Sequence, residues 1–273
     1  LVYDAINKIL NKNKILAPRL YTQRYDKNFI EIEDFGNETV FKTLKKKGKN
    51  KLSYFNRIIK LLIQIQSIKH RKVKNFRNQN YIIPKYDKKI LINEANLFCD
   101  WYAKNNLSKL RKKRFCKKFK KIIKELTLKL KLKDNIFVHR DFHVSNLMSV
   151  KNQIGLIDSQ DALIGNKAYD LASLIDDVRL KTSYSFKEKI FKFYTKKQKN
   201  LDIKKFKNDF EILSVLRNLK IIGIFTRLAL RDRKKNYLRF IPYTWQLINM
   251  RIDQNRTFID LKNLLSQNFK KIK

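Results

Sequence analysis

Apolar residues recur at helical spacing along most of this 273-residue chain, and that periodicity favours a largely helical fold. In residues 110–130, apolar side chains occupy one helical face while lysines fill the remaining faces. A strand is predicted over residues 29–33, and a connection containing Pro84 over residues 73–87. The remaining predicted helices cover residues 3–10, 55–68, 89–102, 210–230 and 243–252.

Glycine is scarce and widely spaced in this sequence. The five glycines never come closer together than ten residues. The chain therefore has neither a GxGxxG loop nor a Walker A loop, which excludes the dinucleotide-binding and P-loop classes of nucleotide site.

Cysteine use and hydropathy bear on the cellular compartment. Cys99 and Cys116 are the two cysteines, and neither has the spacing of a metal ligand. This argues against a disulfide framework or a zinc finger and predicts a reducing, cytoplasmic environment. The most apolar stretches, residues 58–68 and 221–230, are shorter than the roughly 20 residues that span a bilayer. We expect no membrane-spanning helix.

The formal net charge of +40 has two interpretations. It could mark a surface that binds nucleic acid or a membrane, or it could be a composition shared by a whole proteome. Lysines outnumber arginines by 48 to 16, and the lysines of residues 110–130 coat a helix. Since phosphate recognition more often uses arginine forks, we favour the second interpretation and do not expect a nucleic-acid partner.

Residues 138–161 differ from the rest of the chain because they concentrate His, Asp and Asn. Two short apolar runs, residues 147–150 and 154–157, flank Lys151, Asn152 and Gln153. This pattern predicts a β-hairpin with a three-residue turn.

Such a hairpin places the start of its first strand beside the end of its second, so Asn146 and Asp158 become neighbours. Two side-chain oxygens at strand ends suit Mg²⁺, which takes one or two protein ligands and leaves other positions to phosphates and water. Asp141 lies on the loop leading into the hairpin. A carboxylate there can accept a hydroxyl proton and orient the oxygen for attack on a phosphoryl group.

The order HRD, four residues, then Asn resembles the catalytic loop of protein-kinase-like folds, with the metal-binding Asp one hairpin later. HRDFHVSN and IDSQD are more similar to small-molecule kinases of the aminoglycoside phosphotransferase and choline kinase superfamily than to protein kinases. The finer resemblance is to anomeric N-acetylmuramate and N-acetylglucosamine kinases. It rests on residues 33–36 (EDFG), 97–102 (LFCDWY), 157–174 (IDSQDALIGNKAYDLASL) and 219–232 (LKIIGIFTRLALRD).

The resemblance implies roles for residues and a fold. Asp141 would be the catalytic base, Asn146 and Asp158 would bind Mg²⁺, and the break in structure near Glu33 would be the hinge where adenine meets the backbone. The hinge residues are Glu33, Asp34 and Phe35.

We expect an α+β, protein-kinase-like, two-lobed fold with an incomplete N-lobe and a mostly helical C-lobe. Residues 1–36 would be the remnant of the N-lobe and the hinge, and residues 37–273 the C-lobe with the catalytic loop and metal-binding hairpin. The family's phosphate-covering loop and strand lysine have no counterpart before Glu33. We therefore expect several dozen residues to precede Leu1 in the intact enzyme, and this chain to bind ATP poorly.

Other polar and aromatic residues have two interpretations each. His143 either shapes the pocket or contacts a phosphate or sugar. Asp161 contacts the acceptor sugar or a second metal, or only hydrogen-bonds within its loop. Trp101 either stacks on a sugar ring or belongs to the core. We interpret His139 as packing under the loop and Asp170, in the first turn of a helix, as structural.

The predicted activity is transfer of the γ-phosphoryl group of ATP, with Mg²⁺, to a small molecule of the cell-wall amino-sugar type. One alternative is the same fold with another acceptor, such as an aminoglycoside, choline or homoserine. A cationic acceptor favours an acidic or aromatic cage, and no acidic cluster is evident. The other alternative is a non-catalytic basic module that binds RNA or an acidic protein.

Overall fold

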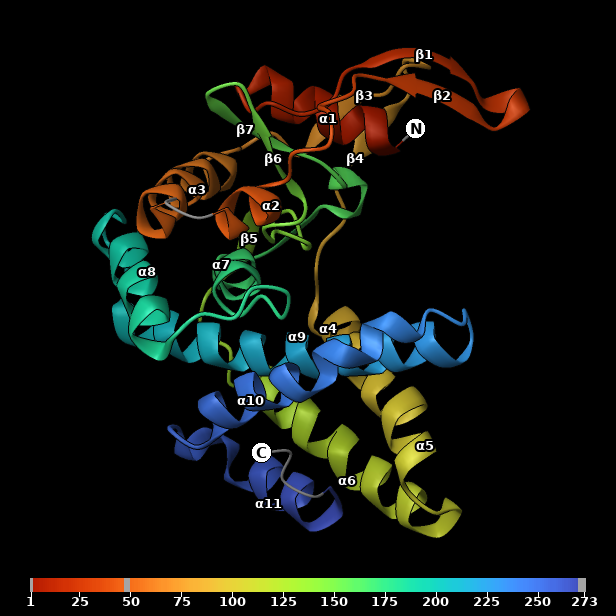
Figure 1. The fold of residues 1–273 in the computed structure, drawn as a ribbon, viewed down its shortest axis with the longest axis vertical. Coiled ribbons are helices and arrows are strands. Elements are labelled where there is room, and N and C mark those ends of the chain that lie inside the picture. The colour runs from red at the N-terminus through yellow and green to blue at the C-terminus, as the bar shows by residue number, and fades with distance from the viewer. Residues whose placement is uncertain (1, 47–49, 270–273) are drawn as a thin grey trace. The chain divides into compact units, whose positions relative to one another are not determined.

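The structure, a computed structural model, describes residues 2–46 and 50–269. The chain forms two compact units, one made of Leu1–Lys85 with Lys133–Leu201 and the other of Tyr86–Leu132 with Asp202–Lys273. Figure 1 labels their elements. The lobe boundary expected at residue 36 stays a prediction.

The first unit combines helices with short antiparallel hairpins and strand pairs. Its helices are α1 (Val2–Lys12), α2 (Val40–Lys45), α3 (Lys51–Gln66), α7 (Ala168–Ile175) and α8 (Tyr184–Lys196), with 3₁₀ turns η1 (Tyr25–Lys27) and η3 (Ser159–Asp161). Its strands are β1 (Leu20–Arg24), β2 (Phe29–Ile32), β3 (Lys72–Lys74), β4 (Asn80–Ile82), β5 (Asp134–Val138), β6 (Leu147–Val150), β7 (Gln153–Leu156) and β8 (Leu163–Asn166). They pair as β1–β2, β3–β4, β5–β8 and β6–β7.

The second unit is helical over its described residues. It contains α4 (Lys88–Leu97), the π-helical segment η2 (Phe98–Ala103), α5 (Lys104–Asn106), α6 (Lys109–Leu128), α9 (Ile203–Leu230), α10 (Ile241–Ile252) and α11 (Ile259–Asn268). Two 3₁₀ segments, η4 (Lys235–Phe240) and η5 (Arg256–Phe258), join the last three helices. None of the helices in the described part of the chain combines the length and the hydropathy needed to cross a membrane.

Side-chain caps explain where several helices begin. Asn50, Asp87, Ser183 and Asp202 precede α3, α4, α8 and α9, and each side chain accepts a backbone N–H from the first turn. Such caps satisfy N–H groups that have no partner within the helix. The helices predicted from apolar spacing and the strand predicted over residues 29–33 are present, with most ends shifted by up to four residues. The helix predicted from residue 210 begins at Ile203, and the one predicted over residues 89–102 continues from α4 into the π-helical η2.

Two local predictions were wrong. Residues 73–87 are not a plain connection, because β3 and β4 pair within them. The Asn75 side chain makes their turn by accepting the N–H groups of Arg77 and Gln79 at 2.9 and 3.1 Å, and Asn78 is left-handed at φ 58°. This is a turn built by asparagine rather than glycine.

The second error concerns the turn between β6 and β7. It has two residues rather than three, since Val150 pairs with Gln153. Lys151 takes the left-handed conformation at φ 49°. A position of this kind is usually marked by Gly or Asn, so the lysine gave no signal for the shorter turn.

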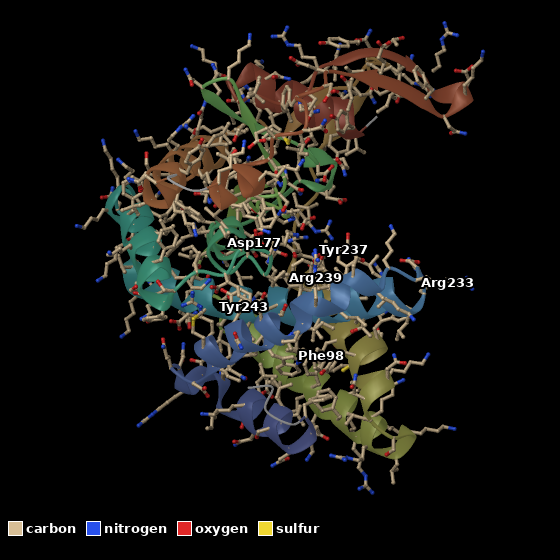
Figure 2. The ribbon with its side chains drawn as sticks, in the orientation of Figure 1. Phe98, Asp177, Arg233, Tyr237, Arg239 and Tyr243 are labelled. Carbon is tan, nitrogen blue, oxygen red and sulfur yellow. The ribbon has the colours of Figure 1, made fainter. Side chains whose placement is uncertain are left out.

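An aromatic cluster centred on Phe98 forms the core of the second unit. Its ring lies 5.1–6.0 Å, between centroids, from Tyr102, Phe115, Phe119, Trp245 and Phe269. Figure 2 labels Phe98 among the side chains. Aromatic pairs at these separations add to the stabilisation from buried area.

Helices α4 and α9 approach each other closely at Gly223. A Cβ on that residue would lie 2.4 Å from both the carbonyl carbon and the oxygen of Leu97. Glycine is thus required at this contact, and the helix widens into η2 directly after Leu97.

Candidate active site

The β6–β7 hairpin brings Asn146 and Asp158 to one end of the same ladder. Leu147 pairs with Leu156, and beyond that pair the N–H of Ile157 donates to the carbonyl of Asn146 at 3.1 Å. Asp158 follows in the left-handed conformation at φ 57°. The adjacency of the two residues therefore matches the expectation from the hairpin, whereas their role as metal ligands stays a prediction.

Asp141 is joined to Asn146 by a compact loop. The Asn146 side-chain amide donates to the Asp141 carbonyl at 3.2 Å, and the His143 N–H donates to the same carbonyl at 3.0 Å. The Asn146 N–H in turn donates to the His143 carbonyl at 2.9 Å. These bonds fix the backbone between the candidate base and the candidate metal ligand.

Burial and two neighbouring carboxylates affect the protonation of Asp158. Partial burial raises the pKa of Asp158 above its ordinary value, and the negative charges of Asp141 and Asp161 raise it further. A nearby cation would offset this crowding of negative charge. The site is therefore electrostatically suited to a divalent ion.

The donor set fits a hard cation. The Asn146 Nδ2 is used by the Asp141 carbonyl, so the Oδ1 at the opposite corner of the amide is the atom offered to an ion. Within the described residues, no cluster of three or more His, Cys, Asp or Glu side chains is placed to hold a metal. One carboxylate and one amide oxygen match Mg²⁺, which draws its other ligands from phosphates and water.

Asp170, in the first turn of α7, hydrogen-bonds to the backbone of the candidate catalytic loop. Its fully buried carboxylate accepts the N–H groups of His139 and Arg140 at 2.7 and 2.9 Å. Arg140 has φ 78°, a conformation that is strained for a residue with a side chain. The two charge-assisted hydrogen bonds hold this conformation, in agreement with the structural role predicted for Asp170.

His139 is buried and connects the loop to the hairpin. Its Nε2 lies 3.1 Å from the carbonyl of Ile157. Burial lowers its pKa to about 4, against the opposing influence of Asp141 and Asp161. A neutral, buried imidazole agrees with the predicted packing role.

The substrate-contact candidates occupy different environments. His143 is buried, whereas Asp161 is exposed and lies 3.6 Å from the Arg140 guanidinium. Trp101 is half-buried on η2 in the second unit, apart in sequence and in unit from the catalytic loop. Their contacts with an acceptor stay predictions.

The predicted hinge segment packs on the hairpin. Glu33 exchanges hydrogen bonds with the backbone of Arg19, and the Asp34 carboxylate accepts the Gly36 N–H at 2.7 Å. A Cβ on Gly155 of β7 would lie 2.8 Å from the Phe35 ring, so glycine permits the ring to lie against the strand. The predicted hinge segment therefore contacts the β6–β7 hairpin, which carries the metal-ligand candidates at its end.

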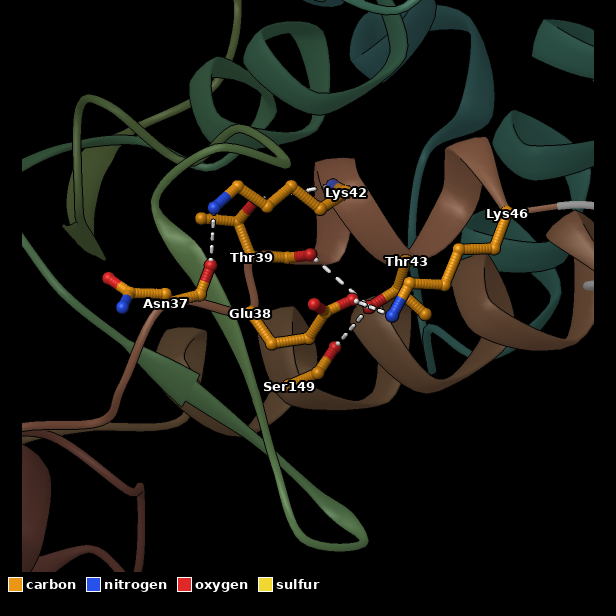
Figure 3. Close-up of polar contacts among 7 residues, drawn as sticks. All are labelled: Asn37, Glu38, Thr39, Lys42, Thr43, Lys46 and Ser149. Atoms are coloured by element: carbon orange, nitrogen blue, oxygen red, sulfur yellow. Dashed lines mark hydrogen bonds and ion pairs between the residues drawn. The ribbon is translucent and has the colours of Figure 1, made fainter.

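A polar network missed by sequence reasoning ties the residues after the hinge to β6 (Figure 3). The Thr43 hydroxyl lies 3.0 Å from the Ser149 hydroxyl and donates to the Glu38 carboxylate at 2.9 Å. Lys46 pairs with Glu38 at 2.8 Å. The contacts of Glu38 with Lys46 and with Thr43 lower the pKa of the Glu38 carboxyl group. The Ser149 N–H donates to the Glu38 carbonyl at 2.8 Å. Residues 106 apart in sequence make this network, and no local motif marks them.

Comparison with known proteins identifies similar chains. The family model described as "Phosphotransferase enzyme family" matches residues 4–201. An N-acetylmuramate/N-acetylglucosamine kinase of Pseudomonas aeruginosa is 28% identical over 256 residues, covering 92% of this chain and 72% of the relative. One of Neisseria meningitidis serogroup B is 27% identical over 232 residues, covering 83% of this chain and 67% of the relative.

Solved structures show the fold. A Plasmodium vivax ethanolamine kinase aligns with TM-score 0.62 and 14% identity over 92% of this chain and 73% of that one. An AMP-bound spectinomycin phosphotransferase aligns with TM-score 0.61 and 14% identity over 93% of this chain and 85% of that one. These alignments confirm the predicted α+β, protein-kinase-like fold class with mostly helical content.

Proposed function

The chain belongs to the phosphotransferase enzyme family and is a small-molecule phosphotransferase, and from that membership we propose that it transfers the γ-phosphoryl group of ATP to a hydroxyl of a cell-wall amino sugar. The observation that carries the proposal is the joining of Asp141, Asn146 and Asp158 by one loop and one hairpin. Four curated relatives with 24–28% identity carry the name N-acetylmuramate/N-acetylglucosamine kinase, which supports this acceptor class.

In the proposed mechanism, Asp141 accepts the proton of the acceptor hydroxyl and orients its oxygen for in-line attack. Asn146 Oδ1 and the Asp158 carboxylate are the groups that would hold Mg²⁺. When bound, the ion supplies positive charge that offsets the charge of the β- and γ-phosphates. The compact 141–146 loop keeps the base and the amide ligand in fixed relation, so most of the rate acceleration comes from positioning.

The remaining candidate residues are assigned to the binding of the nucleotide and of the acceptor. Backbone groups of Glu33, Asp34 and Phe35 receive the adenine, in line with the packing of this segment on β7. His143 and Asp161 contact the sugar. We assign the enzyme to amino-sugar recycling in the cytoplasm, and the free thiols of Cys99 and Cys116 are compatible with that reducing environment.

The direct test is Asp141→Asn, assayed for ATP-dependent phosphorylation of N-acetylmuramate and N-acetylglucosamine by mass spectrometry. Removing the proton acceptor should lower turnover about 10²–10⁴-fold. Asp253→Asn makes the same chemical change at an exposed residue that pairs with Lys262, and it should leave turnover unchanged. Undiminished turnover in a folded Asp141→Asn protein would end the assignment of the base.

The acceptor is tested on the same chain with a panel of hydroxyl compounds. Choline, ethanolamine, homoserine and an aminoglycoside are assayed beside the two amino sugars. A higher kcat/KM for an amino sugar than for the other compounds supports the proposal. Faster phosphorylation of one of the other compounds would retain the phosphotransferase and replace its acceptor.

A further inference from the structure

The peptide group of Val144 is held on both of its sides. Its N–H donates to the Asp177 carboxylate at 3.3 Å, and its carbonyl accepts the Phe41 N–H at 3.0 Å. Val144 is fully buried and lies three residues after Asp141 and two before Asn146. An anchor at this peptide therefore acts on the segment that joins the candidate base to the candidate metal ligand.

We infer that Asp177 is a positioning residue of the phosphoryl-transfer site, holding the downstream half of the catalytic loop through Val144. The inference rests on the proposed function and extends it to a residue outside the catalytic loop and the hairpin. Asp177, labelled in Figure 2, lies just beyond the end of α7 and is almost completely buried.

Helix α7 carries one loop-binding carboxylate at each end. Asp170, in its first turn, holds the N–H groups of His139 and Arg140, and Asp177, two residues after its last, holds that of Val144. Asp141 lies between these anchored peptides in sequence. The rigid helix thus sets the spacing of two fixed points on either side of the candidate base.

Asp177 is itself fixed by neighbouring groups. It accepts the N–H of Arg179 at 3.0 Å and lies 3.4 Å from the Arg179 guanidinium. The adjacent residue, Asp176, forms a buried ion pair with Lys187 of α8 at 3.2 Å. Lys187 also donates to the Ile175 carbonyl at 2.6 Å, so the end of α7 is tied to α8.

The carbonyl side of the Val144 peptide is also held, by the residues at the start of α2. Phe41 lies in the first turn of α2, and Thr39 caps that helix by accepting the Lys42 N–H at 3.2 Å. The same segment is bound to β6 through Glu38, Thr43 and Ser149 (Figure 3). With one side of the peptide set by α2, loss of Asp177 would leave the other side without its acceptor.

The experiment compares Asp177→Ala and Asp177→Asn with wild type in the full chain. Because small displacements of catalytic groups can reduce rates about 10²-fold, we expect Asp177→Ala to lower kcat about 10–100-fold. The KM values for ATP and the amino sugar should stay within about threefold, since the buried Asp177 is assigned to the binding of neither substrate. Asp177→Asn retains an acceptor oxygen and should recover most of the lost kcat.

Amide hydrogen exchange provides a readout independent of turnover. The segment covering residues 142–148 should exchange faster in Asp177→Ala than in wild type, because the Val144 N–H loses its partner. The matched control is Asp209, a buried carboxylate in the second unit that accepts the N–H groups of Lys131 and Leu132 at 2.8 Å each. Asp209→Ala should lower thermal stability without changing kcat or the exchange of residues 142–148.

The outcomes separate the inference from the proposed function. If wild type phosphorylates none of the panel, the proposed function fails and the exchange of residues 142–148 alone decides whether Asp177 holds the loop. Wild-type kcat or unchanged exchange in folded Asp177→Ala overturns the inference, as does an equal kcat loss in Asp209→Ala. Should either alanine variant fail to fold, Asp177→Asn and Asp209→Asn are compared in the same assays. Asp177→Asn should then lower kcat by less than the loss expected for Asp177→Ala, and Asp209→Asn should leave kcat unchanged.

Discussion

At the scale of single residues, the site depends on backbone conformations that only fixed hydrogen bonds maintain. Arg140 and Asp158 are both left-handed, on either side of the loop that contains Asp141 and Asn146. Asp170 holds the first of these turns, and His139 contacts the carbonyl of Ile157 beside the second. The side chains that hold the loop are therefore as important to its geometry as those proposed to react.

His139 gives a pH-dependent prediction at this scale. Its folded-state pKa is about 4, below the ordinary value of about 6.5, so the unfolded chain binds the proton more readily. The stabilisation from neutral His139 is complete above about pH 6.5 and is lost as pH falls toward 4. We expect this residue to contribute about 3 kcal/mol to the loss of unfolding free energy over that interval.

The measurement is urea unfolding from pH 7.5 to 4 for wild type and His139→Gln. Glutamine retains an N–H donor for Ile157 but does not titrate in this range. The variant should show a shallower decline in stability with falling pH. Identical slopes for the two proteins would mean that the buried histidine is not the group whose protonation destabilises the fold.

The candidate reactive residues were predictable because their signal is local. Asp141, Asn146 and Asp158 lie within eighteen residues, and hairpin geometry alone makes the last two neighbours. The Asp177 contact and the Glu38–Ser149 segment depend instead on residues 33 and more positions apart. Spacing in the sequence carries no information about such pairs, so they emerge only from the fold.

At the scale of elements, helices were easier to predict than strands. Apolar spacing identified α3, α6, α9 and α10. Helices α3 and α6 bury an apolar face, whereas α9 is buried on all sides over residues 209–219. The three-residue strands β3 and β4 have exposed ends and one half-buried residue each, which is too short for a pattern of alternation. Their hairpin is defined by the hydrogen bonds of Asn75 rather than by apolar residues.

The close contact of α4 with α9 predicts that replacing a glycine with alanine lowers the stability of the protein, which is the opposite of the usual effect in a helix. Replacing glycine with alanine inside a helix ordinarily stabilises it by about 1 kcal/mol. At Gly223 the added Cβ would overlap the Leu97 backbone, so Gly223→Ala should instead destabilise the protein by about 1–3 kcal/mol. Thermal and denaturant unfolding measure the change.

Lys204→Ala, an exposed substitution on the same helix, serves as the control and should alter stability by no more than about 0.5 kcal/mol. A Gly223→Ala protein that is more stable than wild type would show that the two helices do not approach as closely as described. The size of the destabilisation reports how far α4 can move away from α9.

At the scale of the whole molecule, the proposed catalytic residues and hinge belong to one of the two units. Asp141, Asn146, Asp158 and the hinge residues lie in the unit that contains residues 133–201, whereas Trp101 lies in the other. Two of the three side chains proposed to carry the chemistry, Asp141 and Asp158, are acidic in a chain whose net charge is +40. The lysines on α6 are mostly exposed around a buried apolar face.

The central claim is that Asn146 and Asp158 hold the metal ion that permits phosphoryl transfer to an amino sugar. Its most direct test is mass-spectrometric detection of sugar phosphate formed from ATP over a series of Mg²⁺ concentrations, with wild type, Asp158→Asn and Asp253→Asn. We predict Mg²⁺-dependent product from wild type and Asp253→Asn, and at least about a hundredfold less from Asp158→Asn. Equal product from a folded Asp158→Asn protein, or wild-type product formed without a divalent ion, would contradict the account.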